Sequence, residues 1–203
     1  MYIPAKWGLL LALLLFFATA SWGVTIDEVI HSGNTKALEA FLNSFPAAIE
    51  QRSTILASAT PLFLAIYKRK PAMVRLLLER GASLDARFCG GRTPLHEAGA
   101  LLPEVVPLLL EYGADPNAEN DYGEKPLVDG IFRLLVFAPS FVQTLGPRTL
   151  ITQEDWRRLR HFEATAKSLG QIPSLLRIYQ DHLALLETIC PSSSSPLEPI
   201  TYH

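Results

Sequence analysis

Apolar residues recur three and four positions apart through the first two thirds of the chain, which is the spacing of one face of an α-helix. The pattern predicts pairs of short helices, beginning in 26–42. Its strongest apolar faces lie in 73–79 and 104–111, and each contains three consecutive leucines. Gly81 and Gly113 directly follow these two segments, where a glycine can take the left-handed conformation that ends a helix. The pattern therefore predicts an all-α protein built from helix pairs.

The regular pattern weakens after residue 130. The segment 131–151 contains Pro139, Gly146 and Pro147, and we expect it to be an irregular insertion. Helical spacing resumes in 152–190, which predicts a C-terminal helical pair whose first helix is capped by Thr152. Residues 191–203 are rich in Ser and Pro, a composition typical of a disordered tail.

The first twenty residues have the layout of a secretory signal peptide: a single Lys6, an apolar run over 7–18, and the small-x-small sequence Ala18-Thr19-Ala20. We expect residues 1–20 to be removed, with cleavage after Gly23 as the alternative. The apolar run is shorter than the roughly 20 residues that span a bilayer. We therefore expect a periplasmic or secreted protein with no stable membrane insertion after the leader is removed, and the absence of an Asn-x-Ser/Thr sequon favours the periplasm.

One six-residue motif recurs along the chain. The first copy is Thr60-Pro61-Leu62-Phe63-Leu64-Ala65. The second copy begins 33 residues later and is Thr93-Pro94-Leu95-His96-Glu97-Ala98, and a weaker third copy begins at Lys125, 32 residues further on. Thr at the start of a helix can accept hydrogen bonds from backbone N–H groups, and Pro in the first helical position loses no bond. The repeat resembles the ankyrin family, whose period is 33 residues and whose signature is T-P-L-H-x-A.

The resemblance implies an ankyrin-repeat solenoid of helix-turn-helix units with short hairpin loops and a degenerate helical C-terminal cap. On this alignment the repeats cover 24–130: an N-terminal cap at about 24–54, units at 55–87 and 88–119, and the start of a degenerate unit at 120–130. It also implies structural roles for Thr60, Pro61, Thr93, Pro94, His96, Gly81 and Gly113. His96, the fourth letter of the signature, is expected to hydrogen-bond between neighbouring repeats.

Ankyrin stacks present hairpin tips and the exposed faces of their first helices to other molecules. This sequence places the following residues there: Tyr67, Lys68, Arg87, Phe88, Arg92, Glu119, Asp121, Tyr122 and Glu124. Phe88 and Tyr122 are aromatic residues beside charged ones, which predicts interface anchors. The alternative for Phe88 is that it folds back onto its own hairpin. We therefore expect an exported monomer that binds, and protects or inhibits, a partner protein.

Composition argues against several other classes of function. Lys and Arg number 18 against 20 Asp and Glu, so the sequence lacks the basic excess typical of nucleic-acid binding. The five histidines lack the spacing of a metal site, and no nucleophile elbow, phosphate loop or dinucleotide fingerprint is present. We expect no cofactor and no enzymatic activity.

Three alternatives stay open from the sequence. A small enzyme or a ligand carrier is one, with its site in 131–171, which the resemblance does not cover. A structural accessory of a membrane assembly is another, and an uncleaved leader would favour it. A disulfide between Cys89 and Cys190 is the third, because an exported protein can keep one, although spacing alone does not decide whether the two cysteines meet.

Overall fold

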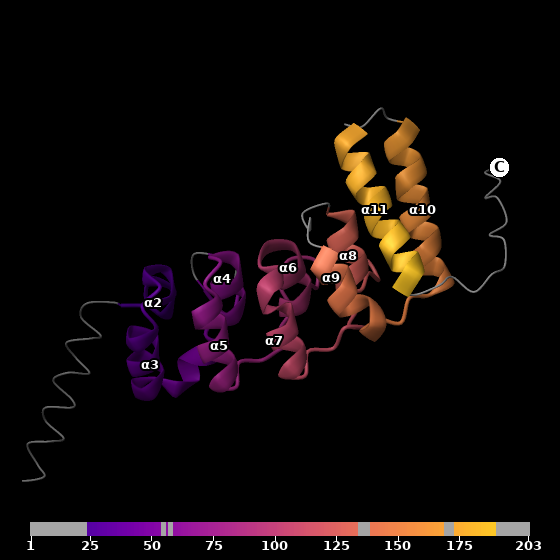
Figure 1. Cartoon of the computed structure of the whole chain (residues 1–203). Coiled ribbons are helices and arrows are strands. Elements are labelled where there is room, and N and C mark those ends of the chain that lie inside the picture. The colour runs from indigo at the N-terminus through magenta and orange to yellow at the C-terminus, as the bar shows by residue number, and fades with distance from the viewer. Residues whose placement is uncertain (1–23, 54–55, 57–58, 134–138, 169–172, 190–203) are drawn as a thin grey trace, which may run out of the picture.

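The helices of the protein pair up along the chain, and successive pairs stand side by side in a row (Figure 1). The computed structural model describes residues 24–53, 56, 59–133, 139–168 and 173–189. The elements are α2 (Ile26–Ser32), α3 (Thr35–Ser44), η1 (Pro46–Glu50), α4 (Pro61–Tyr67), α5 (Pro71–Glu79), α6 (Pro94–Leu101), η2 (Pro103–Val105), α7 (Val106–Glu111), α8 (Pro126–Phe132), α9 (Pro139–Leu145), η3 (Gly146–Arg148), α10 (Gln153–Ser168) and α11 (Pro173–Ile189). The predicted all-α solenoid is confirmed.

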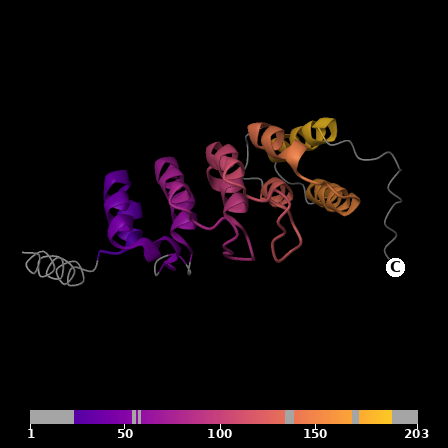
Figure 2. The same ribbon diagram turned by 90° about the horizontal axis from the view of Figure 1, so that it is seen from below.

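The core is continuous because each helix pair packs on the next. The first helices of the pairs contact one another in series, α2 with α4, α4 with α6, and α6 with α8. Leu62 and Leu95 of the repeated motif are buried in these contacts, and so are Leu77 and Leu109 of the second helices. The loops that join successive pairs project together on one side of the row (Figure 2).

Gly81 and Gly113 end the two leucine-rich helices, as predicted. Their φ angles are 83° and 95°, in the left-handed region that favours glycine. In the first of these turns the Ala82 N–H donates to the Leu77 carbonyl and the Gly81 N–H donates to the Leu78 carbonyl, at 2.9 Å each. The same pair of bonds recurs after Gly113, so two Schellman motifs satisfy the last carbonyls of α5 and α7.

The expectation of an irregular insertion at 131–151 is wrong for the part of it that the structure describes. The helix α9 lies in this segment and packs against α7, α8 and α11, so it completes a fourth helix pair with α8. Its residues Phe141, Val142 and Leu145 are buried. Pro139 stands at the first position of the helix, where a missing N–H costs nothing, and Gly146 follows its end.

The C-terminal helices α10 and α11 are longer than those of the repeats and rise beyond the row in Figure 1. A buried ion pair joins them to the repeats: Lys125 Nζ lies 2.6 Å from Asp155 Oδ2 and donates to the Leu150 carbonyl at 2.8 Å. Burial acts to raise the pKa of Asp155, but the bonds from Lys125 and Thr152 outweigh it and hold the pKa below its ordinary value. Lys125 thus replaces the motif threonine with a link to the cap.

The two motif threonines differ from each other, because Thr60 makes no side-chain cap bond and Thr93 forms a capping box with His96. Both precede a helix that begins with proline, but within the described residues the Thr60 hydroxyl has no hydrogen-bond partner. The Thr93 hydroxyl lies 2.8 Å from His96 Nδ1, which also accepts from the Thr93 N–H at 3.1 Å. The difference follows from the third residue of each helix, because Phe63 in the first copy has no polar atom to offer where the second copy has His96.

His96 links two units through both ring nitrogens. Since Nδ1 accepts from Thr93, we assign the ring proton to Nε2, which donates to the Glu124 carbonyl of the next hairpin at 3.0 Å. The ring is fully buried, and this burial lowers the pKa of His96 below its ordinary value. His96 is therefore held neutral between the α6 helix and the loop that follows it.

Truncating the buried leucines should destabilise the whole stack. Leu77 and Leu109 are each 0% exposed, so Leu77→Ala and Leu109→Ala should each lower the free energy of unfolding by about 2 to 5 kcal/mol. Glu79→Ala, on the exposed side of α5, should change it by less than about 0.5 kcal/mol. Urea unfolding followed by circular dichroism measures all three, and equal small effects would contradict the helix pairing.

The His96 ring should make stability depend on pH in a definite direction. Because its pKa is lowered in the folded state, the unfolded chain takes up the proton more readily, and the contribution of His96 is lost as pH falls below about 6.5. His96→Ala should lower the free energy of unfolding at pH 7.5, and this deficit should shrink by pH 5. Urea unfolding at the two pH values tests it, and a deficit that stays constant or grows contradicts the assignment.

Candidate protein-binding surface

The loop after α5 forms a tight hairpin at Phe88–Arg92. Phe88 and Arg92 exchange both backbone hydrogen bonds, Phe88 N–H to Arg92 O at 3.0 Å and Arg92 N–H to Phe88 O at 2.8 Å. Gly90 and Gly91 turn the chain between them with φ angles of 74° and 70°. Cys89 is therefore carried at an exposed tip.

The next tip is built by Asn120 and is bound directly to the first. The Asn120 side-chain oxygen accepts from the N–H groups of Tyr122 and Glu124, at 2.9 and 3.0 Å, which closes the turn. The Asp121 N–H then donates to the Gly90 carbonyl at 2.9 Å. Gly91 is required at this contact, because a Cβ atom there would lie 2.9 Å from the Asp121 backbone nitrogen. The two tips therefore form one continuous surface.

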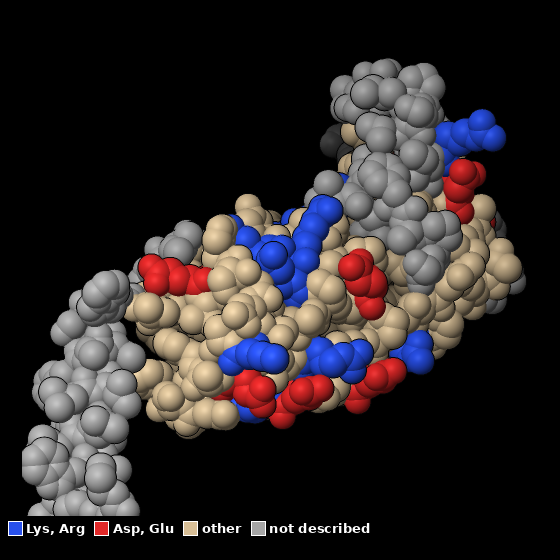
Figure 3. Space-filling model, turned by 60° about the vertical axis from the view of Figure 1, so that its left-hand side comes forward, with Lys and Arg blue, Asp and Glu red and all other residues tan. Residues whose placement is uncertain are grey.

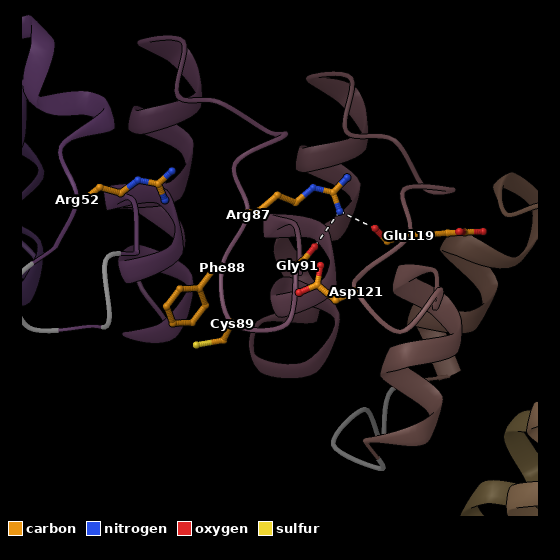
Figure 4. Close-up of a pocket in the computed structure, with 7 residues that line it drawn as sticks. All are labelled: Arg52, Arg87, Phe88, Cys89, Gly91, Glu119 and Asp121. Carbon is orange, nitrogen blue, oxygen red and sulfur yellow. Dashed lines mark hydrogen bonds between the residues drawn. The ribbon is translucent and has the colours of Figure 1, made fainter.

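Arg87 fastens the base of the same two tips. Its Nη1 donates to the Gly91 carbonyl at 2.8 Å and to the Glu119 carbonyl at 2.6 Å. Figure 4 shows the second terminal nitrogen of Arg87 pointing away from both carbonyls. The guanidinium thus holds neighbouring units together and still presents positive charge at the surface.

A shallow depression of about 550 Å³ lies between the tips. Its lining residues are Arg52, Arg87, Phe88, Cys89, Gly91, Glu119 and Asp121. In Figure 4 the two arginines lie toward the earlier units and the acidic residues toward the later ones. Sequence analysis missed Arg52, although it precedes Arg87 by 35 residues, close to one repeat. The loosely matched first unit hid this correspondence.

The predicted binding residues divide into two groups. Exposed residues are Tyr67, Arg87, Glu119, Asp121 and Tyr122, and half-buried ones are Lys68, Phe88, Arg92 and Glu124. Tyr122 is 63% exposed and Tyr67 is 52% exposed, so both aromatic rings are available to another molecule. Lys68 Nζ lies 5.8 Å from the centre of the Tyr67 ring, within the range of a cation–π contact.

Phe88 packs neither outward nor onto its own hairpin. Its ring lies against the ring of Phe63 in α4, with the centroids 5.3 Å apart and the planes at 43°. This is the tilted arrangement that aromatic pairs favour. Phe88 therefore contributes to folding, since its ring joins the tip to the preceding unit.

Arg92 links the first tip, where its Nη1 donates to the Cys89 carbonyl at 3.1 Å, to an ion network inside the stack. Its Nη2 lies 2.9 Å from Asp129 Oδ1, and this bond raises the pKa of Arg92 above its ordinary value. Arg133 pairs with Glu97 at 3.0 Å and lies 3.6 Å from Asp129, so two arginines neutralise two buried carboxylates. Arg92 therefore ties α6 and its hairpin to α8, and the prediction that it contacts a partner is corrected.

Glu124 is also engaged inside the protein. Its carboxylate accepts from the Asn120 amide at 3.0 Å, and its carbonyl accepts from His96. Glu124 borders a second depression, of about 550 Å³, with Phe132 of α8 and Phe162 of α10. The two rings lie 5.5 Å apart and give this corner groove between repeats and cap an apolar wall.

Other candidate chemistry has less support within the described residues. In that part of the chain no group of three or more His, Cys, Asp and Glu side chains could hold a metal ion, and no helix is long and apolar enough to cross a membrane. Cys190 and the expected leader lie outside the described residues, so the disulfide and the cleavage site stay predictions. Figure 3 shows basic and acidic side chains alternating along the lower edge of the face in view.

Known proteins resemble the repeat region. The family model for ankyrin repeats, in three copies, matches residues 27–120. Mouse ankyrin repeat and SOCS box protein 16 is 38% identical over 95 residues, which cover 44% of this chain and 21% of that protein. Human ankyrin repeat and SOCS box protein 9 is 36% identical over 93 residues, 45% of this chain and 31% of that protein.

A third relative carries an enzyme's name. Mouse 2-5A-dependent ribonuclease is 39% identical over 87 residues, but these cover 41% of this chain and 11% of that protein. The chain thus spans a tenth to a third of the length of these relatives. The similarity lies in the repeats, whose signature, 33-residue step and stacked helix pairs agree with it. Residues 27–120 of this chain are therefore ankyrin repeats.

Proposed function

We propose that the protein is an exported interaction module that binds a partner protein in the periplasm through its tip surface, and that binding protects or inhibits this partner. The tip surface consists of Tyr67, Arg87, Phe88, Glu119, Asp121 and Tyr122. Ankyrin repeats indicate a protein–protein interaction module, which supports the binding role. The signal-peptide layout of residues 1–20 supports export.

One observation carries the choice of surface. Tyr122 exposes 63% of its area and directly follows Asp121, which lines the depression together with Arg87. Exposed aromatic residues beside charged groups supply much of the binding energy of protein interfaces. The backbone beneath Tyr122 is fixed by Asn120 and by Arg158, whose Nη1 donates to the Tyr122 carbonyl at 3.0 Å. A ring held on a rigid turn loses little entropy when it binds.

The similarity to a ribonuclease does not lead us to propose catalysis. It covers 11% of that protein and lies in the part of this chain that has ankyrin repeats. The corner groove favours a second candidate function, a carrier of an apolar ligand, because Phe132 and Phe162 line it. We rank this function below protein binding, since Arg158, the cation at that groove, already bonds Glu154 and two backbone carbonyls.

Removing the Tyr122 ring should weaken partner capture without unfolding the protein. Tyr122→Ala should lower affinity for the captured partner about 5- to 30-fold, as loss of 1 to 2 kcal/mol does. Its melting temperature should stay within about 2 °C of the wild type. The readout is affinity capture of the mature protein from its own compartment, followed by titration of the partner recovered.

Tyr112 offers a matched control, because it is a 42% exposed tyrosine that follows α7 and is not one of the residues of the tip surface. Tyr112→Ala should leave capture unchanged. Equal capture by wild type and Tyr122→Ala would place binding elsewhere. If Phe162→Ala then abolishes capture while it remains folded, the corner groove carries the function.

Export should remove the leader. The layout of Lys6, the apolar run and Ala18-Thr19-Ala20 predicts a mature chain that begins at Ser21 or, with the alternative site, at Val24. Intact mass of the protein from a periplasmic extract measures this directly. A membrane-bound form that keeps residues 1–20 would contradict export as a mature protein and favour an accessory of a membrane assembly.

A further inference from the structure

The depression between the tips has a charge order that follows the order of the units. Arg52 lies before α4, Arg87 before α6 and Glu119 before α8, so the three residues come from the loops before successive first helices. Asp121 adds a second carboxylate at the acidic end. The lining thus has two positive groups toward the N-terminal units and two negative groups toward the C-terminal ones, with no net charge.

An apolar side chain lies at the basic end of the depression. Phe88 lies between Arg52 and Arg87 in Figure 4, and the part of its ring that does not touch Phe63 lines the depression. Arg87 turns one terminal nitrogen toward the carbonyls and the other away from them. The side chain of Glu119 points away from Arg87, since the bond between these residues uses the Glu119 carbonyl.

From this arrangement we propose that the depression binds an extended segment of a protein partner with two acidic side chains and an apolar one between them at one end, and basic side chains at the other end. The acidic groups face Arg52 and Arg87, the apolar group covers Phe88, and the basic groups face Glu119 and Asp121. This inference rests on the proposed function and names the chemistry of its partner.

The size of the repeat sets the length of the segment. Neighbouring helices pack about 10 Å apart, so two repeats place Arg52 and Glu119 about 20 Å from each other. An extended chain covers this distance in about six residues. A uniformly acidic segment would be attracted by the arginines and repelled by the carboxylates. A uniformly basic segment would be attracted by the carboxylates and repelled by the arginines. Only a segment with both charges is complementary along the whole depression.

Synthetic peptides of about eight residues test this charge order. The dipolar probe has a leucine between two glutamates, then a tyrosine and two lysines, and it is made in both orders because either chain direction satisfies the proposal. In the acidic and basic probes all four charges have one sign. Fluorescence polarisation at low salt should find the better dipolar probe about fivefold tighter than either single-sign probe, the effect of two exposed charge pairs. High salt should remove this difference.

Two variants should change the preference in opposite directions. Arg52→Glu with Arg87→Glu makes the depression acidic, so the basic probe should become the tightest. Glu119→Lys should instead strengthen binding of the acidic probe. This substitution leaves the backbone bond from Arg87 to the Glu119 carbonyl in place, so it tests the proposal even if the double variant is unstable. Arg75→Glu changes an exposed arginine of α5 outside the depression and should leave the order as in the wild type.

Equal binding of all probes, no dipolar binding at millimolar peptide, or an order that the variants leave unchanged would overturn the charge inference. Such a result together with loss of partner capture in Tyr122→Ala would leave the proposed function standing with a partner of different chemistry. Normal capture by Tyr122→Ala would instead remove the proposed function, whichever probe the depression prefers.

Discussion

The structure depends on one constraint: in the described part of the chain, the helix pairs share one core. Leu77 and Leu109 belong to a single cluster of buried residues that runs through successive pairs. A stack of this kind must end, and the last pair must hide one apolar face. Here α10 and α11 close it, and the buried pair of Lys125 and Asp155 fixes where they attach. The cost of desolvating both charges offsets much of their attraction. The ion pair therefore specifies the position of the cap more than it adds stability.

The same logic applies to the polar groups between units. His96 bonds the Glu124 carbonyl, and Arg92 bonds Asp129, so these two polar groups of α6 and its hairpin find partners in the following unit. Losing one partner would strand a buried charge or donor, which is costly. These bonds therefore allow one rotation of each unit on the next. A rigid row follows, and the tips keep fixed positions relative to one another.

Local signals with a physical cause could be predicted from the sequence, and contacts between units could not. The Schellman turns at Gly81 and Gly113 and the α11 bounds follow from single-residue preferences and apolar spacing. The helix α9 was missed because Pro139 and Gly146, taken as breaks, stand at its two ends. Arg92 looked like a tip residue, since only the fold brings Asp129, 37 residues later, to its guanidinium. Arg52 was missed because its unit lacks the motif.

Binding residues on such a scaffold differ in how much they also support the fold. Tyr122 is 63% exposed, so packing inside the protein places little constraint on which residue stands there. Phe88 is constrained from both sides, because it lines the depression and packs on Phe63. Arg87 is intermediate, as one terminal nitrogen joins two units while the other is turned away. Substitutions at Phe88 therefore change binding and stability together, and those at Tyr122 separate the two.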